Sequence, residues 1–395
     1  MPFQHGNLIQ MRVTHKIRKI QAPPITEVKS WLSGRVFPAE KPLVDLCQAV
    51  PSYSPATELI QHLKNSLDDP QTFKYSPDEG LPEVRSEVCA WYQRHYQGAP
   101  TPSQLCLTIG ASQAFWLTIS ALCEPGDEVI VQLPAYFDHL MGLQALGIKP
   151  VYAPFDPATA GQPDLETISS LIGPMTKAIL LVTPSNPTGT VIPAEQITAF
   201  FELAQSRNIS LILDETYNAF IGTTPHFLFN RPDWQHSFIQ IASFGKTFAL
   251  TGLRCGALIA NDEFIQQALK IQDSMVVCQS RPAQLALEFG CRHLDEWVSK
   301  NSVTMEQRHD CFKTDFLAAQ TDFKLIASGS FFAWVKHPWK DLTGRQAAKW
   351  LVEEANLICL PGEAFGPGLE PYLRLAFGNI EIEQIAEAVA RFQHV

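Results

Sequence analysis

The sequence predicts an α/β protein with two lobes, in which a large lobe holds a mostly parallel sheet between helices and a smaller lobe is α+β. The chain of 395 residues exceeds the usual size of a single hydrophobic core. Between residues 104 and 260, short apolar runs alternate with longer amphipathic segments, which is typical of helices packed on both faces of a sheet. After residue 281, a long helical run and fewer strands indicate the α+β lobe.

Seven strands are expected in the large lobe, and several are apolar throughout, so that both faces of the sheet should be buried and most pairings parallel. They are expected at 104–108, 128–132, 149–153, 177–183, 209–214, 237–243 and 256–260, with helices between them at 111–123, 137–146 and 194–206. In the smaller lobe we expect a helical run over 282–317, strands at 323–327, 331–336 and 373–377, and helices near 344–354 and 381–392.

The predicted domain organisation has three parts. Residues 1–45 form an N-terminal arm and part of the small domain, and the arm packs onto the small domain. Residues 46–281 form the large domain, and residues 282–395 form an interdomain helix and the C-terminal small domain.

Composition excludes several classes of protein. The net charge of -10 disfavours a nucleic-acid partner, which would require clustered Lys and Arg. The apolar runs are of strand length, so no membrane span is expected. Nine cysteines, an odd number without Cys-x-x-Cys spacing, argue against disulfides and against a metal site. We therefore expect reduced thiols and a cytoplasmic protein.

Lys246 is the candidate centre of the chemistry. It follows an expected strand, and a lysine in a dry pocket has a destabilised ammonium form, so it can attack an aldehyde and move protons. The sequence Gly245-Lys246-Thr247 also resembles the end of a P-loop, but that motif needs a glycine where the chain has Gln240. Taken alone, Lys246 could equally be an ordinary surface lysine.

Asp214 ends an apolar strand, which places it at the carboxyl edge of the sheet, where ligands of open α/β folds bind. A buried carboxylate needs a partner, and the protonated nitrogen of a pyridine ring is one. Tyr217 and Asn186 could both donate to a phenolate oxygen on that ring. A helix N-cap or a metal ligand would also explain Asp214, and Asn186 lies in a good turn sequence.

Further residues suit an anionic, ring-containing ligand. Gly110, Ala111 and Ser112 open a helix after a strand, so their N–H groups and the serine hydroxyl suit a phosphate. Ser243 could add a hydroxyl and Arg254 a positive charge to the same anion site.

Tyr136 follows the next strand and could stack on a ring. Arg374, in an alternating strand, could clamp a substrate carboxylate with two hydrogen bonds. Each feature has an ordinary structural explanation when taken alone. Together they indicate a site for pyridoxal 5'-phosphate, which needs an amine, a carboxylate, phosphate donors and a flat ring contact.

From about residue 44 to residue 377, the chain resembles the class I/II aminotransferases of the fold-type I pyridoxal-phosphate enzymes, in the branch with aspartate, aromatic and kynurenine aminotransferases. The motifs that carry the resemblance are Thr108-x-Gly110-x-x-x-Ala114, Asn186-Pro187-x-Gly189, Asp214-x-x-Tyr217, Ser243-x-x-Lys246, Gly252-x-Arg254-x-Gly256 and Pro361-Gly362-x-x-Phe365-Gly366 before Arg374.

The resemblance implies a role for each of these residues. Lys246 would be the Schiff-base lysine and the acid/base, and Asp214 would pair with the pyridine nitrogen. The other cofactor contacts would be Asn186 and Tyr217 at the phenolate oxygen, Tyr136 on the ring, and Gly110, Ala111, Ser112, Ser243 and Arg254 at the phosphate. The substrate would meet Asn186, Arg374 and a loop at Ala49, where the family often has glycine. Tyr75 would reach the neighbouring subunit's cofactor, which implies a homodimer with shared sites.

The implied activity is a ping-pong transfer of an amino group between an L-amino acid and a 2-oxo acid. A β- or γ-eliminating lyase or a cyclase on the same fold remains an alternative, and so does a non-catalytic ligand sensor. The substrate side chain is undetermined. Arg281 could bind a second carboxylate, cap the following helix or support an interface, whereas Trp31 and Tyr53 suggest an aromatic or apolar side chain.

Overall fold

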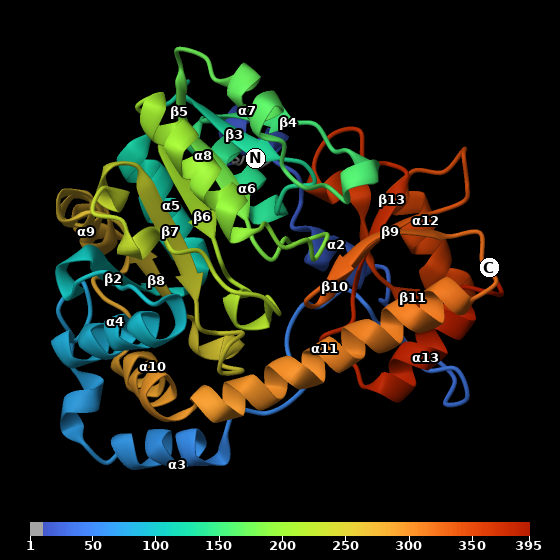
Figure 1. Cartoon of the computed structure of the whole chain (residues 1–395). Coiled ribbons are helices and arrows are strands. Elements are labelled where there is room, and N and C mark those ends of the chain that lie inside the picture. Colours follow the sequence, from blue (N-terminus) through green and yellow to red (C-terminus); the bar gives the residue numbers. More distant parts are fainter. Residues whose placement is uncertain (1–10) are drawn as a thin grey trace, which may run out of the picture.

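The computed structural model describes residues 11–395, which form a large sheet between helices and a small sheet covered by helices on one side (Figure 1). The first ten residues of the predicted N-terminal arm lie outside the described residues. The α/β fold class is confirmed, and the domain boundaries at residues 45 and 281 stay predictions.

The large sheet has seven strands in the order β2-β8-β7-β6-β5-β3-β4. Their bounds are β2 Leu105–Ile109, β3 Glu128–Gln132, β4 Lys149–Ala153, β5 Thr176–Val182, β6 Ser210–Asp214, β7 Phe238–Ser243 and β8 Cys255–Ile259. All pairings are parallel except those of β8, which runs antiparallel to β2 and to β7. The predicted strands are therefore confirmed to within one residue at each end.

Both faces of this sheet are buried, because successive residues of one strand enter different cores. Leu211 and Leu213 of β6 pack in one core, and Ile212 packs in the other. The first core includes side chains of α4 (Pro82–Tyr96), α7 (Leu165–Leu171), α8 (Ala194–Ser206) and α10 (Arg281–His293). The second includes side chains of α5 (Gly110–Leu122), α6 (Phe137–Leu146) and α9 (Asp262–Val276).

The small sheet is antiparallel, in the order β12-β13-β10-β9. Its strands are β9 (Lys324–Gly329), β10 (Phe332–Lys336), β12 (Leu360–Pro361) and β13 (Tyr372–Ala376), and its helices are α11 (Asp295–Ala318), α12 (Gly344–Trp350) and α13 (Ile382–Arg391). A π-helical turn, Leu351–Ala355, extends α12. The predicted helical run over 282–317 is in fact two helices, α10 and α11, which meet at Leu294.

The N-terminal segment contacts both lobes. Helix α2 (Pro24–Ser30) is tied to α12 by Glu27, which binds Arg345 at 2.7 Å, and β1 (Val44–Asp45) pairs with β11 (Leu357–Ile358). Helix α1 (His15–Lys19), however, packs against α6 of the large lobe. The segment after residue 23 therefore contacts the small sheet's helices and strands, whereas α1 contacts the large lobe, and the domain assignment of the arm stays a prediction. Helix α3 (Thr57–Ser66) packs on α10.

Among residues 11–395, no helix combines the length and the apolar character needed to cross a membrane.

Candidate active site

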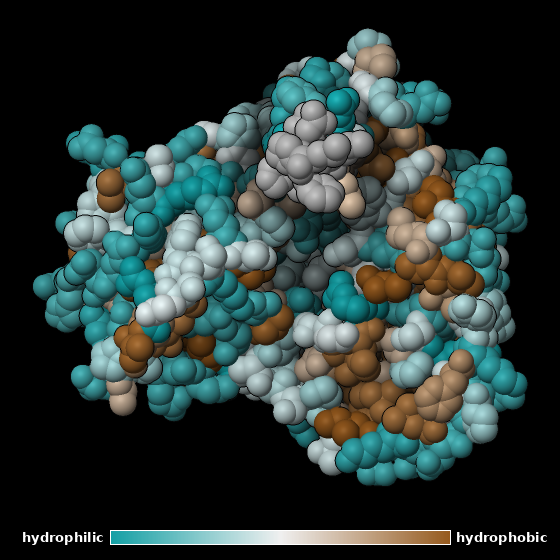
Figure 2. Space-filling view, turned by 180° about the vertical axis from the view of Figure 1, so that it is seen from behind, coloured by the Kyte–Doolittle hydropathy of each residue, from teal (hydrophilic) through white to brown (hydrophobic). Residues whose placement is uncertain are grey.

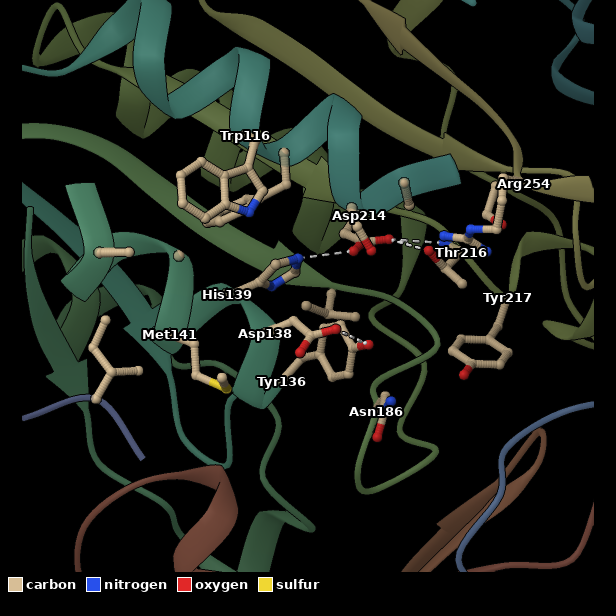
Figure 3. A pocket seen from close by; sticks show the side chains of 18 of the residues that line it. Trp116, Tyr136, Asp138, His139, Met141, Asn186, Asp214, Thr216, Tyr217 and Arg254 are labelled. Atoms are coloured by element: carbon tan, nitrogen blue, oxygen red, sulfur yellow. Dashed lines mark hydrogen bonds and ion pairs between the residues drawn. The ribbon is translucent and has the colours of Figure 1, made fainter. Parts of the chain in front are cut away.

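A cavity of about 600 Å³ opens where β5, β6 and β7 end and α5 begins. Its walls include most of the residues that the sequence singled out, namely Ala111, Ser112, Tyr136, Asn186, Asp214, Tyr217, Ser243, Lys246 and Arg254. These side chains converge from several elements (Figure 3). The convergence follows from the fold, because the carboxyl ends of parallel strands meet at one edge of a sheet.

Lys246 lies three residues beyond the end of β7 and is half-buried. Burial, and to a lesser degree the positive charge of Arg254, lowers the pKa of Lys246 to about 8, although Asp214 acts in the opposite direction. Its Nζ atom lies 6.0 Å from the centroid of the Tyr217 ring. A substantial fraction of this lysine is therefore an unprotonated amine at neutral to mildly basic pH, which is the form that attacks an aldehyde.

Asp214 ends β6 and is 3% exposed. Its Oδ1 atom accepts hydrogen bonds from the backbone N–H and the hydroxyl of Thr216, at 2.9 and 2.7 Å. Its Oδ2 atom lies 3.1 Å from Nε2 of the buried His139 (Figure 3). The carboxylate is thus oriented by two neighbours and keeps acceptor capacity for a ligand at the cavity.

The mouth of α5 forms an anion site with Arg254. Gly110 has φ +72°, and a Cβ atom built on it would lie 2.4 Å from Nη2 of Arg254. A Cβ atom on Gly256 would lie 2.4 Å from the backbone of Gly110. The two glycines therefore allow the guanidinium to approach the free N–H groups at the start of the helix, beside Ser112 and Ser243 on the cavity wall.

Three polar side chains frame the opposite wall. The Tyr136 hydroxyl donates to Oδ2 of Asp138 at 2.7 Å, which orients the tyrosine ring beside the cavity. Asn186 is 7% exposed and lies on the wall with Tyr217. Burial raises the pKa of Tyr217, so that its hydroxyl remains a hydrogen-bond donor.

Arg374 comes from β13 of the small sheet and lies behind Asn186. It is 1% exposed, its Nη1 atom donates to Oδ1 of Asn186 at 3.3 Å, and its Nη2 atom donates to the carbonyl of Cys47. Its Nε atom is buried without a hydrogen-bond partner, and no acidic residue among residues 11–395 forms an ion pair with it. A buried guanidinium in this state suits an anionic ligand.

Several predicted residues are not on the cavity wall. Gly110 is buried beneath it, and Ala49 packs in a small apolar cluster beside Tyr217. Tyr75 is 78% exposed and does not line this chain's cavity, while its carbonyl accepts a hydrogen bond from Arg281. Trp31 and Tyr53 do not line the cavity, and the preference for an aromatic or apolar side chain stays a prediction.

The structure adds residues that sequence reasoning missed. His139 lies on the first turn of α6, three positions after Tyr136, and this helical spacing was the available signal. Trp116 of α5 and Met141 of α6 line the cavity, and so do Ile17 of α1 and Ile20, the residue after α1. No strand or motif pattern marks these four residues, because they lie on or beside helices whose packing only the fold determines.

The donor set corresponds to the cofactor that the sequence suggests. The amine of Lys246, the oriented carboxylate of Asp214 and the anion site at α5 suit an aldehyde, a pyridine nitrogen and a phosphate, respectively. These residues fit pyridoxal 5'-phosphate.

Comparison with known proteins agrees with this chemistry. A family described as "Aminotransferase class I and II" matches residues 41–392. An aromatic aminotransferase of Arabidopsis thaliana is 26% identical over 378 residues, covering 94% of this chain and 93% of that protein. An aspartate aminotransferase of Pyrococcus horikoshii is 26% identical over 348 residues, covering 87% and 88%. The solved aspartate aminotransferase from Thermus thermophilus with maleate has a TM-score of 0.88 at 24% identity, covering 98% and 100%, which establishes the fold.

Proposed function

Because this chain belongs to the class I and II aminotransferase family, we propose that Lys246 is its catalytic residue. Membership makes the chain a pyridoxal-phosphate-dependent enzyme that exchanges an amino group between an amino acid and a 2-oxo acid. The reported relatives are aminotransferases, and nothing in them favours the elimination alternative. The observation that carries the proposal is the convergence of Lys246, Asp214 and Arg254 on one cavity.

When bound, the cofactor supplies an aldehyde that binds amines and a ring that withdraws electrons from the substrate carbon. Lys246 would hold the aldehyde through Nζ, and the same atom would serve as the base toward the substrate. Its lowered pKa of about 8 would let Nζ accept a proton from the substrate α-carbon and release it again. A ping-pong exchange needs this reversible proton carrier.

Asp214 holds a proton on the pyridine nitrogen. Its carboxylate is buried, fixed by Thr216 and adjacent to His139, so it meets the ring with little reorganisation. Tyr136 contacts the ring face. Asn186 and Tyr217 donate to the phenolate oxygen.

The phosphate is held at the N-terminus of α5. Ala111 and Ser112 provide donors from the helix, Arg254 provides charge, and Ser243 provides a hydroxyl. Gly110 permits the close approach of Arg254. This anchor keeps the cofactor in place while its aldehyde changes partner.

Arg374 binds the α-carboxylate that amino acids and 2-oxo acids share. Within residues 11–395 its Nε atom has no hydrogen-bond partner and no acidic residue pairs with it, which supports this role. The hydrogen bond to Asn186 links the carboxylate clamp to the cofactor contact. Ala49 lies beside Tyr217 and contributes shape rather than charge.

We also propose a homodimer with shared active sites. Tyr75, Phe73 and Met275 are 78%, 72% and 44% exposed. Figure 2 shows apolar side chains gathered on the lobe that contains α3, α4 and α10, which in that view lies at the lower right. Such a patch is typical of an interface, and an exposed Tyr75 is available to a neighbouring subunit's site.

The proposed amino donor has an apolar or aromatic side chain. Trp116, Met141, Ile17 and Ile20 line the free part of the cavity, and Arg281 is turned toward the carbonyl of Tyr75 instead. One of the reported relatives is an aromatic aminotransferase. A cytoplasmic location belongs to the same proposal and is supported by the nine free cysteines.

The test is an absorbance titration of the purified protein. The wild type should bind pyridoxal 5'-phosphate with a visible band, lose the band with an amino donor and regain it with a 2-oxo acid. Lys246→Ala should bind the cofactor without covalent capture by borohydride and without turnover. Mapping the reduced adduct to another lysine, or failure of every 2-oxo acid to restore the band, would contradict the proposal. A panel of donors then tests the side-chain preference.

A further inference from the structure

A buried polar cluster lies directly behind the turn that carries Asp214 and Tyr217. At its centre is Glu215, which is 1% exposed. The Oε2 atom of Glu215 accepts hydrogen bonds from the Tyr96 hydroxyl at 3.0 Å, from Nε2 of His226 at 3.2 Å and from the side-chain amide of Gln240. These donors come from α4, from the loop after β6 and from β7. None of the four side chains lines the catalytic cavity.

The donors to Glu215 are neutral. Nδ1 of His226 accepts the backbone N–H of Leu228 at 3.2 Å, so it carries no proton, and the single imidazole proton is on Nε2, facing Glu215. Burial and the nearby carboxylate raise the pKa of Tyr96 well above its ordinary value, so its hydroxyl remains a donor. Among residues 11–395, no lysine or arginine forms an ion pair with Glu215. The carboxylate is therefore stabilised by converging hydrogen bonds.

These bonds fix the backbone on both sides of Glu215. Its N–H donates to the carbonyl of Ile241 on β7 at 3.0 Å, and its carbonyl accepts from the N–H of Asn218 at 3.1 Å. The Asn218 amide donates in turn to the Tyr96 hydroxyl at 3.1 Å. Asp214 faces the cavity and Glu215 faces the core, as successive residues of an extended chain do. A shift of Glu215 would therefore move Asp214.

We infer that Glu215 is a positioning residue for the aminotransfer reaction. Its acceptor oxygen, held by three neutral donors, fixes the turn so that Asp214 and Tyr217 meet the cofactor in register. The carboxylate acts through that turn and touches neither substrate nor cofactor. This inference rests on the proposed roles of Asp214 and Tyr217.

Two tyrosines of α4 provide a matched test. Tyr92 and Tyr96 are both buried, with ring centroids 5.0 Å apart, but the Tyr92 hydroxyl has no hydrogen-bond partner in the described part of the chain. Tyr96→Phe removes a bond to a charged group and should weaken pyridoxal-phosphate binding to the apoenzyme by roughly tenfold. Tyr92→Phe should leave binding within about twofold of the wild type.

Dissociation constants come from fluorescence titration of the apoenzymes, and thermal midpoints report any general loss of stability. Tyr96→Phe should also change the circular dichroism of the bound cofactor and lower kcat more than it raises KM. Equal cofactor binding, dichroism and kcat in the two variants would overturn the inference, even if Tyr96→Phe is less stable.

A second pair of variants changes Glu215 itself. Glu215→Gln keeps an acceptor oxygen and should bind the cofactor within about threefold of the wild type, whereas Glu215→Leu should lose at least about tenfold. If Glu215→Leu does not fold, the tyrosine pair still decides. A wild-type protein that binds no pyridoxal phosphate would refute the proposed function. A wild type that binds it, together with a Glu215→Leu variant that binds equally well, would refute only this inference.

Discussion

Arg374→Lys tests whether a guanidinium clamps the carboxylate of the substrate. The side chain is 1% exposed, and its Nε atom has no partner among the described residues. A lysine ammonium keeps the charge but cannot present two parallel N–H groups to one carboxylate. Loss of one charge-assisted hydrogen bond costs about 1.5–3 kcal/mol, so kcat/KM should fall roughly 10- to 150-fold.

The assay compares an amino acid with the amine that has the same side chain but no carboxylate. Arg374→Lys should lower kcat/KM for the amino acid and for the 2-oxo acid, and it should leave the slow reaction of the amine unchanged. Arg391→Lys is the matched control, because Arg391 is 6% exposed and donates to the backbone carbonyls of Pro42 and Ala355, in the small lobe. The reasoning is wrong if the amine and the amino acid lose the same factor, or if the control reproduces the loss.

Three further predictions concern the cofactor site. Because burial lowers the pKa of Lys246 to about 8, the reactive free amine predominates above that pH. In stopped-flow absorbance, the rate of cofactor capture by the apoenzyme should therefore rise through pH 8 to a plateau, and a midpoint near pH 10.5 would contradict this. Gly110→Ala places a Cβ atom against Arg254 at a position with positive φ and should weaken cofactor binding about tenfold or more. Gly252→Ala, at a position with open space around it, should leave cofactor binding unchanged, and titration of the two apoenzymes with the cofactor compares them. His139→Phe removes the polar neighbour of Asp214 and should lower kcat by about tenfold, and an unchanged kcat would mean that Thr216 orients the carboxylate alone.

The large sheet could be predicted from sequence because each strand carries its own signal. Strands β5 and β6 carry continuous apolar runs, at residues 178–182 and 211–213, since helices bury both faces, and polar turns separate them. Strands β1, β11 and β12 have two residues each and show no periodicity. The break between α10 and α11 at Leu294 was also missed, because that residue is buried and neither glycine nor proline marks it.

Most of the candidate site residues that the sequence offers lie at or just after the end of a strand. Asp214 and Ser243 end strands of one sheet, so topology alone brings them to a shared edge. His139 reaches Asp214 because α6 crosses behind the cavity, and Arg374 reaches Asn186 because the small sheet docks against the large lobe. Such contacts depend on the relative placement of elements, which no local pattern encodes.

The same buried charges that prepare the site for anions oppose the folding of the chain without its ligands. Arg374 is desolvated, it has no acidic partner among the residues that the structure describes, and burial lowers its pKa. Lys246 has a folded pKa of about 8 against an ordinary value of 10.5, so the unfolded chain binds the extra proton between these values. The corresponding loss of stability is complete below about pH 8 and disappears as the pH rises to 10.5. A phosphate and a carboxylate bound at Arg254 and Arg374 would supply the missing counter-charges, and covalent capture would remove the charge of Lys246. Cofactor and substrate binding at these residues would therefore complete the electrostatics of the fold, and the stability that the protein lacks without its ligands would become part of the affinity for them.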